Sequence, residues 1–452
     1  MEKDNRGDDI VLLFDTYTTA SRDLYTSFKT AGYQVQAVVM NDDGFLPDDV
    51  MSVYGEFLGQ FTEAEGCPGR PIYFNQVKTP PYWSLNGNNT KGEIHNMEVL
   101  RADIFYTEPK HKRLVKAVDW KSDKGVVRCT DHYNRYGALY ARTTFNAKQQ
   151  KVNKSFFDAK GREIIVENYV TGDIILNDGD VVRIFNNKTE FTAYLLKQKG
   201  FDKKRIFFNS LGAPLFVSNY LEQSAPGVKE DVVFWQEPTG AEIPGNMRTI
   251  FNGSSKRASR VVVQNHDSYQ KLIGLGAPKD KTSELGFIYS FRRSNHHKRG
   301  ILICTNTENV EKINELMQAL PQFTFHITAL TEMSPKLMSV ERYDNARLYP
   351  NVRMNKLDEL FGDCDYFLDI NHEGEICDAT RRAFLNNMLI LAFDSTAHGR
   401  AYTAQENIFA PANYMGMANV IRKLEATHPD MDIRLENQRK WALTAQPEDY
   451  VF

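Results

Sequence analysis

The chain has 452 residues, too many for one ordinary hydrophobic core and suited to two or three domains. Apolar residues make up 42% and charged residues 25%, with a net charge of -3, so nothing in the composition indicates a nucleic-acid partner. The five cysteines form no metal-binding spacing, the N-terminus lacks the pattern of a signal peptide, and no apolar run reaches membrane-spanning length. We therefore expect a soluble cytoplasmic protein with reduced thiols, no metal and no cofactor.

Residues 1–70 have the pattern of a parallel α/β sheet. The stretch IVLLFDTYTTASRDLYTSFKTAGYQVQAVVM reads as strand, polar turn, amphipathic helix, Gly32 and strand. Its turn contains no glycine, which excludes a dinucleotide-binding loop. The Ser and Thr residues of that turn fit helix caps better than ligand groups. We predict that residues 1–70 form the first part of a Rossmann-like half.

Residues 71–188 differ in texture and predict an inserted antiparallel β-domain. Short β-prone runs such as KAVDW, GVVRCT and REIIVENYV are separated by the turn sequences SDKG, NAKQQ, DAKG and NDGD. The triplet Asp178-Gly179-Asp180 resembles a metal-binding DxD motif, but it lies inside one of these turns. We therefore predict a hairpin turn there and no metal.

The remaining residues return to alternating strands and helices. Residues 189–290 predict the second part of the first half, and residues 291–430, beginning with the basic stretch FRRSNHHKRG, predict a second Rossmann-like half. In that half, TENVEKINELMQAL predicts a helix, with Thr305 and Glu308 at capping-box spacing. One long helix is predicted through ANVIRKLEATH and LENQRKWALTA, and residues 431–452 are predicted to return to the first half.

The predicted fold class is α/β, with two doubly wound parallel sheets facing across a cleft and an antiparallel β-domain inserted in the first half. Ligands of such folds bind at the carboxyl ends of the strands. The loop NHEGEIC follows the predicted strand DYFLDI at such an end. It is the first place to look for a site.

The order of elements resembles a retaining GT-B glycosyltransferase. More closely, the strings VDWKSDKGVVRCTDHYNRYGALYARTTFN, ENYVTGDIIL, FHITALTEMSPKLMS and LDINHEGEICDATRRAFLNN resemble the GtfB-type subunit of the accessory Sec system. That family is the non-catalytic co-activator, or stabilizing protein, of the enzyme that attaches N-acetylglucosamine to serine-rich-repeat adhesins. The resemblance covers essentially the whole chain. It implies a heteromer, such as a heterotetramer, with a catalytic GtfA-type subunit.

The donor site implied by this resemblance is degenerate. Retaining GT-B enzymes carry two glutamates eight positions apart, and the second one accepts hydrogen bonds from a ribose diol. Here the residue eight beyond Glu373 is Arg381, and the residue eight beyond Glu375 is Ala383. An arginine has no acceptor, so it cannot replace that carboxylate.

Two further features complete this site. The Arg and Lys that neutralise the donor diphosphate in those enzymes correspond to a loop that begins with Thr305 and Asn306. Arg381 and Arg382 fit solvated helix residues, or partners of Glu373 or Asp378, better than an anion site. We predict no catalytic residue and no intrinsic transferase activity, because catalysis needs charge placed where charge develops.

The predicted β-domain is rich in aromatic residues and arginine, which are typical interface anchors. A partner subunit or an extended Ser/Thr-rich acceptor fits such a sheet, and packing within the domain is the alternative. In the resembling family the two subunits associate through related β-domains. The candidate residues are Trp120, Tyr133, Arg135, Tyr136, Tyr140 and Arg142.

Three functions remain open on these grounds. The first is a non-catalytic co-activator and chaperone that stabilises a partner O-GlcNAc transferase and binds the unfolded Ser/Thr-rich adhesin. The second is an active retaining glycosyltransferase that moves a sugar from UDP-GlcNAc to Ser or Thr. The third is a lectin-like binder that needs no partner. We favour the first, in the cytoplasm, with any membrane association peripheral and through partners.

Overall fold

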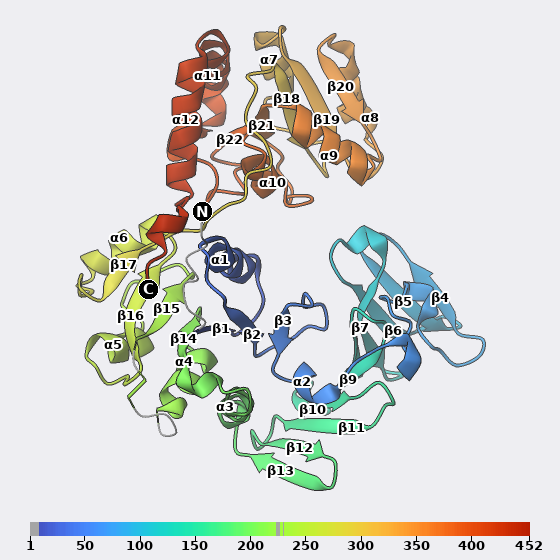
Figure 1. Cartoon of the computed structure of the whole chain (residues 1–452). Coiled ribbons are helices and arrows are strands. Elements are labelled where there is room, and N and C mark those ends of the chain that lie inside the picture. The colour runs from blue at the N-terminus through green and yellow to red at the C-terminus, as the bar shows by residue number, and fades with distance from the viewer. Residues whose placement is uncertain (1–8, 223–226, 229) are drawn as a thin grey trace. The chain divides into compact units, whose positions relative to one another are not determined.

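The computed structural model describes residues 9–222, 227–228 and 230–452, and the chain divides into two compact units, Met1–Glu284 and Leu285–Phe452. Within the described residues, the first unit has a parallel and an antiparallel sheet, and the second unit has one parallel sheet (Figure 1). No helix in these residues has the length and apolar character needed to cross a bilayer.

The parallel sheet of the first unit has the strand order β17-β16-β15-β14-β1-β2-β3. All five residues of β1, IVLLF, are buried, as expected for a strand covered by helices on both faces. Thr18 caps α1 by accepting the Ser21 N–H, so the predicted capping role of this turn is confirmed. The strands are β1 Ile10–Phe14, β2 Gln36–Val39, β3 Val50–Ser52, β14 Arg205–Phe208, β15 Asp231–Trp235, β16 Ala258–Val263 and β17 Thr282–Glu284. The helices are α1 Thr19–Thr30, α2 Gly55–Leu58, α3 Lys188–Gln198, α4 Ala213–Leu221, α5 Gly245–Phe251 and α6 His266–Gly274.

The antiparallel sheet is a meander in which each strand pairs with the next. Asp178 pairs with Val181, so the predicted DGD turn is the β12–β13 hairpin, with Gly179 at φ 62°. The strands are β4 Ser84–Gly87, β5 Lys91–Asn96, β6 Val99–Tyr106, β7 Val115–Lys121, β8 Val127–Tyr133, β9 Leu139–Phe145, β10 Lys151–Phe157, β11 Glu163–Asn168, β12 Ile174–Asp178 and β13 Val181–Phe185.

One face of this meander shares a hydrophobic core with the parallel sheet of the same unit. Phe156 of β10 stacks on Tyr54 with ring centroids 4.3 Å apart, and Ile165 and Leu176 join the same buried cluster. A second, smaller core lies around Ile94, Ala102, Ile104 and Val118, toward the other end of the meander. The antiparallel sheet is therefore packed into the first unit rather than attached by a linker alone.

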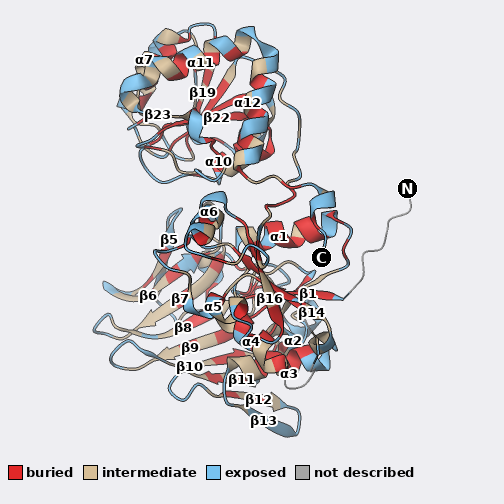
Figure 2. Ribbon diagram, turned by 90° about the vertical axis from the view of Figure 1, so that its left-hand side faces the viewer, coloured by how far each residue is buried: buried red, intermediate tan, exposed pale blue. Residues whose placement is uncertain are grey.

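The second unit has a parallel sheet in the order β20-β19-β18-β21-β22-β23. Its central strands are buried, while the outer helix faces are exposed (Figure 2). The strands are β18 Gly300–Cys304, β19 Thr324–Thr328, β20 Ala346–Tyr349, β21 Tyr366–Asp369, β22 Leu389–Phe393 and β23 Ile408–Phe409. The helices are α7 Ile313–Ala319, α8 Pro335–Met338, α9 Met354–Asp363, α10 Ala379–Leu385, α11 Tyr414–Ala426 and α12 His428–Trp441.

Two helix predictions in this unit are wrong. The helix expected from Thr305 begins only at Ile313, because residues 309–311 pair with residues 370–372 and Lys312 has φ 53°. The single long helix expected near the C-terminus is broken at Thr427 into α11 and α12. Pro429 stands in the first turn of α12, where its missing N–H and fixed φ are tolerated, whereas they would disrupt a continuous helix.

Residues 443–450, near the end of the chain, contact residues 286–287, where the second unit begins. The Phe287 N–H donates to the Leu443 carbonyl, and the Ala445 N–H donates to the Phe287 carbonyl. The buried Tyr450 donates its hydroxyl to the Gly286 carbonyl at 2.7 Å. A Cβ on Gly286 would lie 1.5 Å from the Leu443 carbonyl oxygen, so this seam requires glycine. The domain boundaries stated above, including a return of residues 431–452 to the first half, stay predictions.

Candidate functional site

The carboxyl ends of β18 and β21 are tied together by buried side chains. Thr305, directly after β18, donates its hydroxyl to Asn371 Oδ1 at 2.7 Å. Both residues are buried, at 0% and 2% exposure. Asn371 Nδ2 donates to the Asn306 side chain at 3.2 Å and to the Glu373 carbonyl at 2.8 Å. The predicted site residues Thr305, Asn306 and Glu373 are therefore brought together by Asn371, which the sequence did not single out.

A short backbone ladder covers the same strand ends. The Glu311 N–H donates to the Ile370 carbonyl at 2.8 Å, and the His372 N–H donates to the Asn309 carbonyl at 3.1 Å, on either side of a Val310–Asn371 bridge. His372 also pairs with Glu311 at 2.7 Å. The backbone N–H groups of Glu311 and His372 are therefore used within the chain and are not offered to an anion.

The two glutamates of the loop have different roles. Glu375 Oε1 accepts the Thr380 backbone N–H at 2.6 Å, which satisfies a donor in the first turn of α10. Glu373 is exposed and contributes its backbone carbonyl to the cluster. The carboxylate nearest the helix is therefore occupied by the helix itself.

Arg381 and Arg382 are largely covered rather than solvated. Their side chains are 13% and 12% exposed. Arg381 lies 3.9 Å from Asp378, and Arg382 pairs with Asp358 and places its guanidinium 4.3 Å from the centre of the Phe361 ring. Pairing with Asp378, one of the alternatives open from the sequence, describes Arg381. Arg382 pairs instead with Asp358, which the sequence did not indicate.

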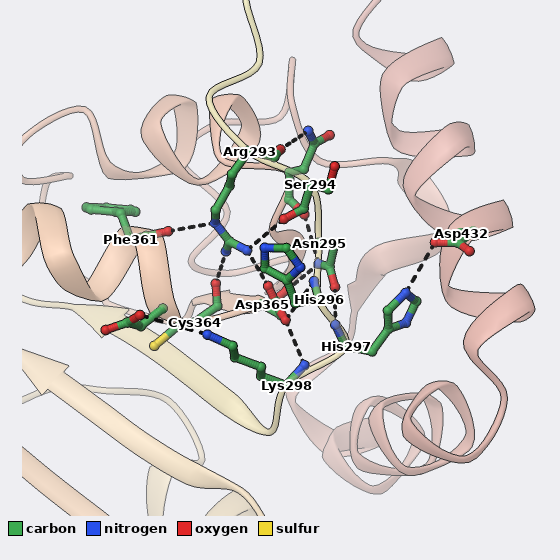
Figure 3. Close-up of polar contacts among 12 residues, drawn as sticks. Arg293, Ser294, Asn295, His296, His297, Lys298, Phe361, Cys364, Asp365 and Asp432 are labelled. Carbon is green, nitrogen blue, oxygen red and sulfur yellow. Dashed lines mark hydrogen bonds and ion pairs between the residues drawn. The ribbon is translucent and has the colours of Figure 1, made fainter.

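The basic stretch 291–300 lies at the opposite, amino edge of the sheet. Arg293 donates to the buried carboxylate of Asp365 and to the carbonyls of Cys364 and Phe361 (Figure 3). The backbone N–H groups of His296 and Lys298 complete the shell around Asp365 at 3.0 and 2.7 Å. This stretch anchors the start of the unit and is no part of the carboxyl-edge cluster.

In the meander, two of the candidate anchors meet around one buried carboxylate. Arg142 donates two hydrogen bonds to Asp131, and Trp120 Nε1 donates to the same carboxylate at 2.8 Å. Asp131 and Arg142 are register partners on β8 and β9. Trp120 and Arg142 are half-buried, so part of each remains available on that face. Asp131 was missed from the sequence. It lies on β8, between the strands β7 and β9 that carry the donors Trp120 and Arg142, and this position is the signal that predicts such an acceptor.

The other candidates lie at the β8–β9 turn or in a core. Arg135 and Tyr136 both contact Asp48, at 3.0 and 3.1 Å, beside a cavity of about 190 Å³. Tyr140 is 4% exposed and belongs to the shared core, and Tyr133 packs against the smaller core. The candidates thus separate into a surface pair, a turn pair and two packed tyrosines.

Metal ligation has no support among the described residues, where no group of three or more His, Cys, Asp or Glu side chains is placed to hold an ion. Asp178 and Asp180 lie in the hairpin turn.

Four family models match the chain. They are described as the GtfB N-terminal domain at residues 11–57, the GtfB middle domain at 83–186, the GtfB third domain at 188–275 and the GftB/GlyA-F C-terminal domain at 301–438. The stabilizing protein GtfB of the UDP-N-acetylglucosamine–peptide N-acetylglucosaminyltransferase of Streptococcus agalactiae is 41% identical over 98% of both chains. The chain belongs to the GtfB family.

Other relatives agree with this GtfB assignment. The GtfB stabilizing protein of Streptococcus gordonii is 38% identical over 96% of this chain and 95% of its own length. The crystal structure of a GtfA/B complex bound to UDP and GlcNAc contains a chain 37% identical to this one, with a TM-score of 0.92 over 97% of this chain and 98% of that chain. The predicted family and the GT-B-like fold with its inserted antiparallel sheet are confirmed.

Proposed function

We propose that this chain is the non-catalytic subunit of a protein O-GlcNAc transferase, which stabilises a GtfA-type catalytic partner and binds the unfolded Ser/Thr-rich acceptor. The observation that carries the proposal is the closure of the β18 and β21 ends, where Thr305 binds Asn371 and the 309–311 backbone pairs with residues 370–372. The family relationship supplies the partner, because the relatives are named as stabilizing proteins of such a transferase.

The chemistry at the closed strand ends supports a non-catalytic role. The position eight residues beyond Glu373 carries Arg381, whose side chain offers donors but no acceptor for a ribose diol. Glu375 is engaged by the α10 backbone. Thr305 and Asn306 supply no positive charge for a diphosphate, so the donor's charges would lack compensation there.

The same features point to one decisive measurement. The isolated chain, the partner alone and the co-expressed pair are assayed for transfer from UDP-GlcNAc to a Ser/Thr-rich peptide. We expect transfer by the pair well above that of the partner alone, and none by the isolated chain. Transfer by the isolated chain would establish the alternative, an active retaining glycosyltransferase. Equal transfer with and without this chain would refute the stabilising role.

We further propose that the face of the meander around Trp120 and Arg142 contributes to binding of the partner or the acceptor. Both side chains are half-buried, and both are held in place by Asp131, which limits the entropy lost on binding. Tyr140 is excluded from this role in the chain alone by its burial. Arg135 and Tyr136 form a separate candidate patch at the β8–β9 turn.

Substitution of Trp120 separates the two patches. Trp120→Phe keeps a ring but removes the indole donor to Asp131, and we expect weaker co-purification with the partner or weaker peptide binding. Tyr136→Phe removes the hydroxyl bond to Asp48 and serves as the matched test of the turn patch. Thr171→Ala, at an exposed turn of the same meander, is the control. Unchanged partner and peptide affinity in Trp120→Phe, with the fold intact, would remove this face from the proposal.

The proposed localisation of the complex is the cytoplasm. Any association with the membrane would be peripheral and would occur through partners. Cell fractionation tests this. A pool that stays with membranes after a salt wash and in the absence of the partner would contradict it.

A further inference from the structure

His398 is held between two acceptors in the second unit. It lies in the turn after β22, and its Nδ1 is 2.6 Å from Asp369 Oδ1. Its Nε2 is 2.6 Å from the backbone carbonyl oxygen of Glu373. The His398 backbone N–H donates to the other oxygen of Asp369, also at 2.6 Å. One residue thus binds the end of β21 and the loop after it.

The two ring contacts decide the charge of His398. A carbonyl oxygen can only accept, so Nε2 must carry a proton, and an ionised carboxylate likewise needs a proton on Nδ1. A histidine that donates from both ring nitrogens is an imidazolium. The side chain of Asp369 is 5% exposed and that of His398 is 21% exposed, so this ion pair is shielded from water.

The groups that act on His398 come from two segments. Partial burial lowers its pKa, but the hydrogen bond and charge of Asp369, the Glu373 carbonyl and the charge of Glu375 together raise the pKa above the ordinary histidine value. Helix α10 approaches this turn at Gly399, the residue after His398. The side chain next to Gly399 is the uncharged Thr380, whose Cγ2 would lie 2.3 Å from a Cβ on Gly399. From its own turn, Thr396 donates to the Asp369 carbonyl at 2.8 Å.

These contacts surround the loop of residues 371–375. Asn371 is bound to Thr305 on one side, Glu375 is bound to the first turn of α10 on the other, and the Glu373 carbonyl between them is bound by His398. The same carbonyl accepts from Asn371 at 2.8 Å. His398 is therefore a charged donor to the middle of the loop.

We propose that the imidazolium of His398 is an internal latch, which holds the 371–375 loop closed over the carboxyl ends of β18 and β21. The His398 cation thus fixes the conformation of this loop by a contact within the protein, in the way that a bound ligand fixes a loop over a binding site. His398 cannot act there as a general base, because neither ring nitrogen has a lone pair to offer. It is a positioning residue, and loss of its proton releases the Glu373 or the Asp369 contact.

The first test uses the unaltered full-length chain. The imidazole of His398 is titrated by NMR, and backbone hydrogen exchange of residues 371–380 is followed over the same pH range after correction for intrinsic exchange. We expect His398 to titrate above the ordinary value of about 6.5. Protection of the loop amides should fall as pH rises through that titration, while β1 and β14 stay unchanged. A His398 pKa at or below the ordinary value would overturn the latch. So would amide protection of the loop that stays constant while His398 loses its proton.

Substitutions supply the second test. His398→Gln removes the charge, and we expect loop protection at pH 6 to fall about tenfold for each unit by which the pKa is raised. His372→Gln is the matched control, because His372 lies in the same loop but is exposed and its side chain pairs with Glu311. Full protection in His398→Gln refutes the proposal. If that variant loses protection in α12 as well, the unit has unfolded, and the titration of the unaltered chain decides.

Discussion

Strand β21 has a buried aspartate at each end, and the two carboxylates are paired with different cations. Asp365, just before the strand, is 0% exposed and is paired with Arg293 at the amino edge of the sheet. Asp369, at the last position of the strand, is 4% exposed and is paired with His398 at the carboxyl edge. Each carboxylate also accepts backbone N–H groups, from His296 and Lys298 in one case and from His398 in the other.

The difference lies in the cation. An arginine stays charged at every pH that a protein meets, so the amino edge is held permanently. A histidine loses its charge within the accessible range, so the carboxyl edge is held conditionally. The edge that would carry ligands in this fold is the one whose closure depends on pH. Stability and responsiveness are thus placed at opposite ends of one strand.

Arg293→Ala attacks the permanent edge and should have the largest effect. It leaves the Asp365 carboxylate buried without its cation, which costs about 3–5 kcal/mol of unfolding free energy. Chemical denaturation of the full chain measures this. Arg292→Ala, at the exposed neighbouring position, is the control and should stay within about 0.5 kcal/mol. Similar small losses for both variants would show that Asp365 is not stabilised through Arg293.

Asp369→Asn attacks the conditional edge and should cost less. The shape is kept but the charge that binds His398 is lost, and hydrogen bonds to charged groups contribute about 1.5–3 kcal/mol. At pH 6 we therefore expect a loss in unfolding free energy of that order, together with a lower pKa for His398. An unaltered His398 titration in this variant would separate the two residues.

The pH dependence sharpens the contrast between the edges. His398 has a raised pKa in the folded chain, so its stabilisation is fully present below the unfolded value of about 6.5 and is lost as pH rises through the folded pKa. The unfolding free energy of the native chain minus that of His398→Gln should therefore shrink from pH 6 toward pH 9. The corresponding difference for Arg293→Ala should stay nearly level across that interval.

Glu375→Ala is expected to have the smallest effect. It removes the acceptor of the Thr380 N–H in the first turn of α10, a capping contact of about 1 kcal/mol. Glu373→Ala is the matched control, since Glu373 contributes its backbone and its side chain is exposed. Thermal unfolding of the two variants compares them directly. Equal shifts would mean that the two carboxylates are interchangeable, against the geometry.

Much of the architecture could be predicted from local patterns. Apolar runs such as Ile10–Phe14 and Leu389–Phe393 identify buried parallel strands, and the Asp178-Gly179-Asp180 turn identifies a hairpin, because these signals act over a few residues. The prediction failed at residues 308–312, because Val310 falls within the predicted helix TENVEKINELMQAL but pairs with Asn371 instead. Tertiary pairing overrode local propensity there.

The candidate site was predictable in position but not in its partners. The loop after β21 was found from the strand–loop–helix pattern, and the pairing of Arg381 with Asp378 was one of the alternatives considered. His398 stands 29 residues beyond Asp369, and nothing in the intervening sequence indicates that two turns meet. Such contacts depend on the order of strands β21 and β22 in the sheet, which local spacing does not specify.

The seam at Gly286 has a practical consequence. Tyr450 and Leu443 bind Gly286 and Phe287, so the last residues of the second unit lie beside its first ones. A fluorophore attached near Tyr450 would sit next to Gly286 without interrupting the parallel sheet of this unit. Its emission would report whether the first and last segments of the unit stay together during unfolding.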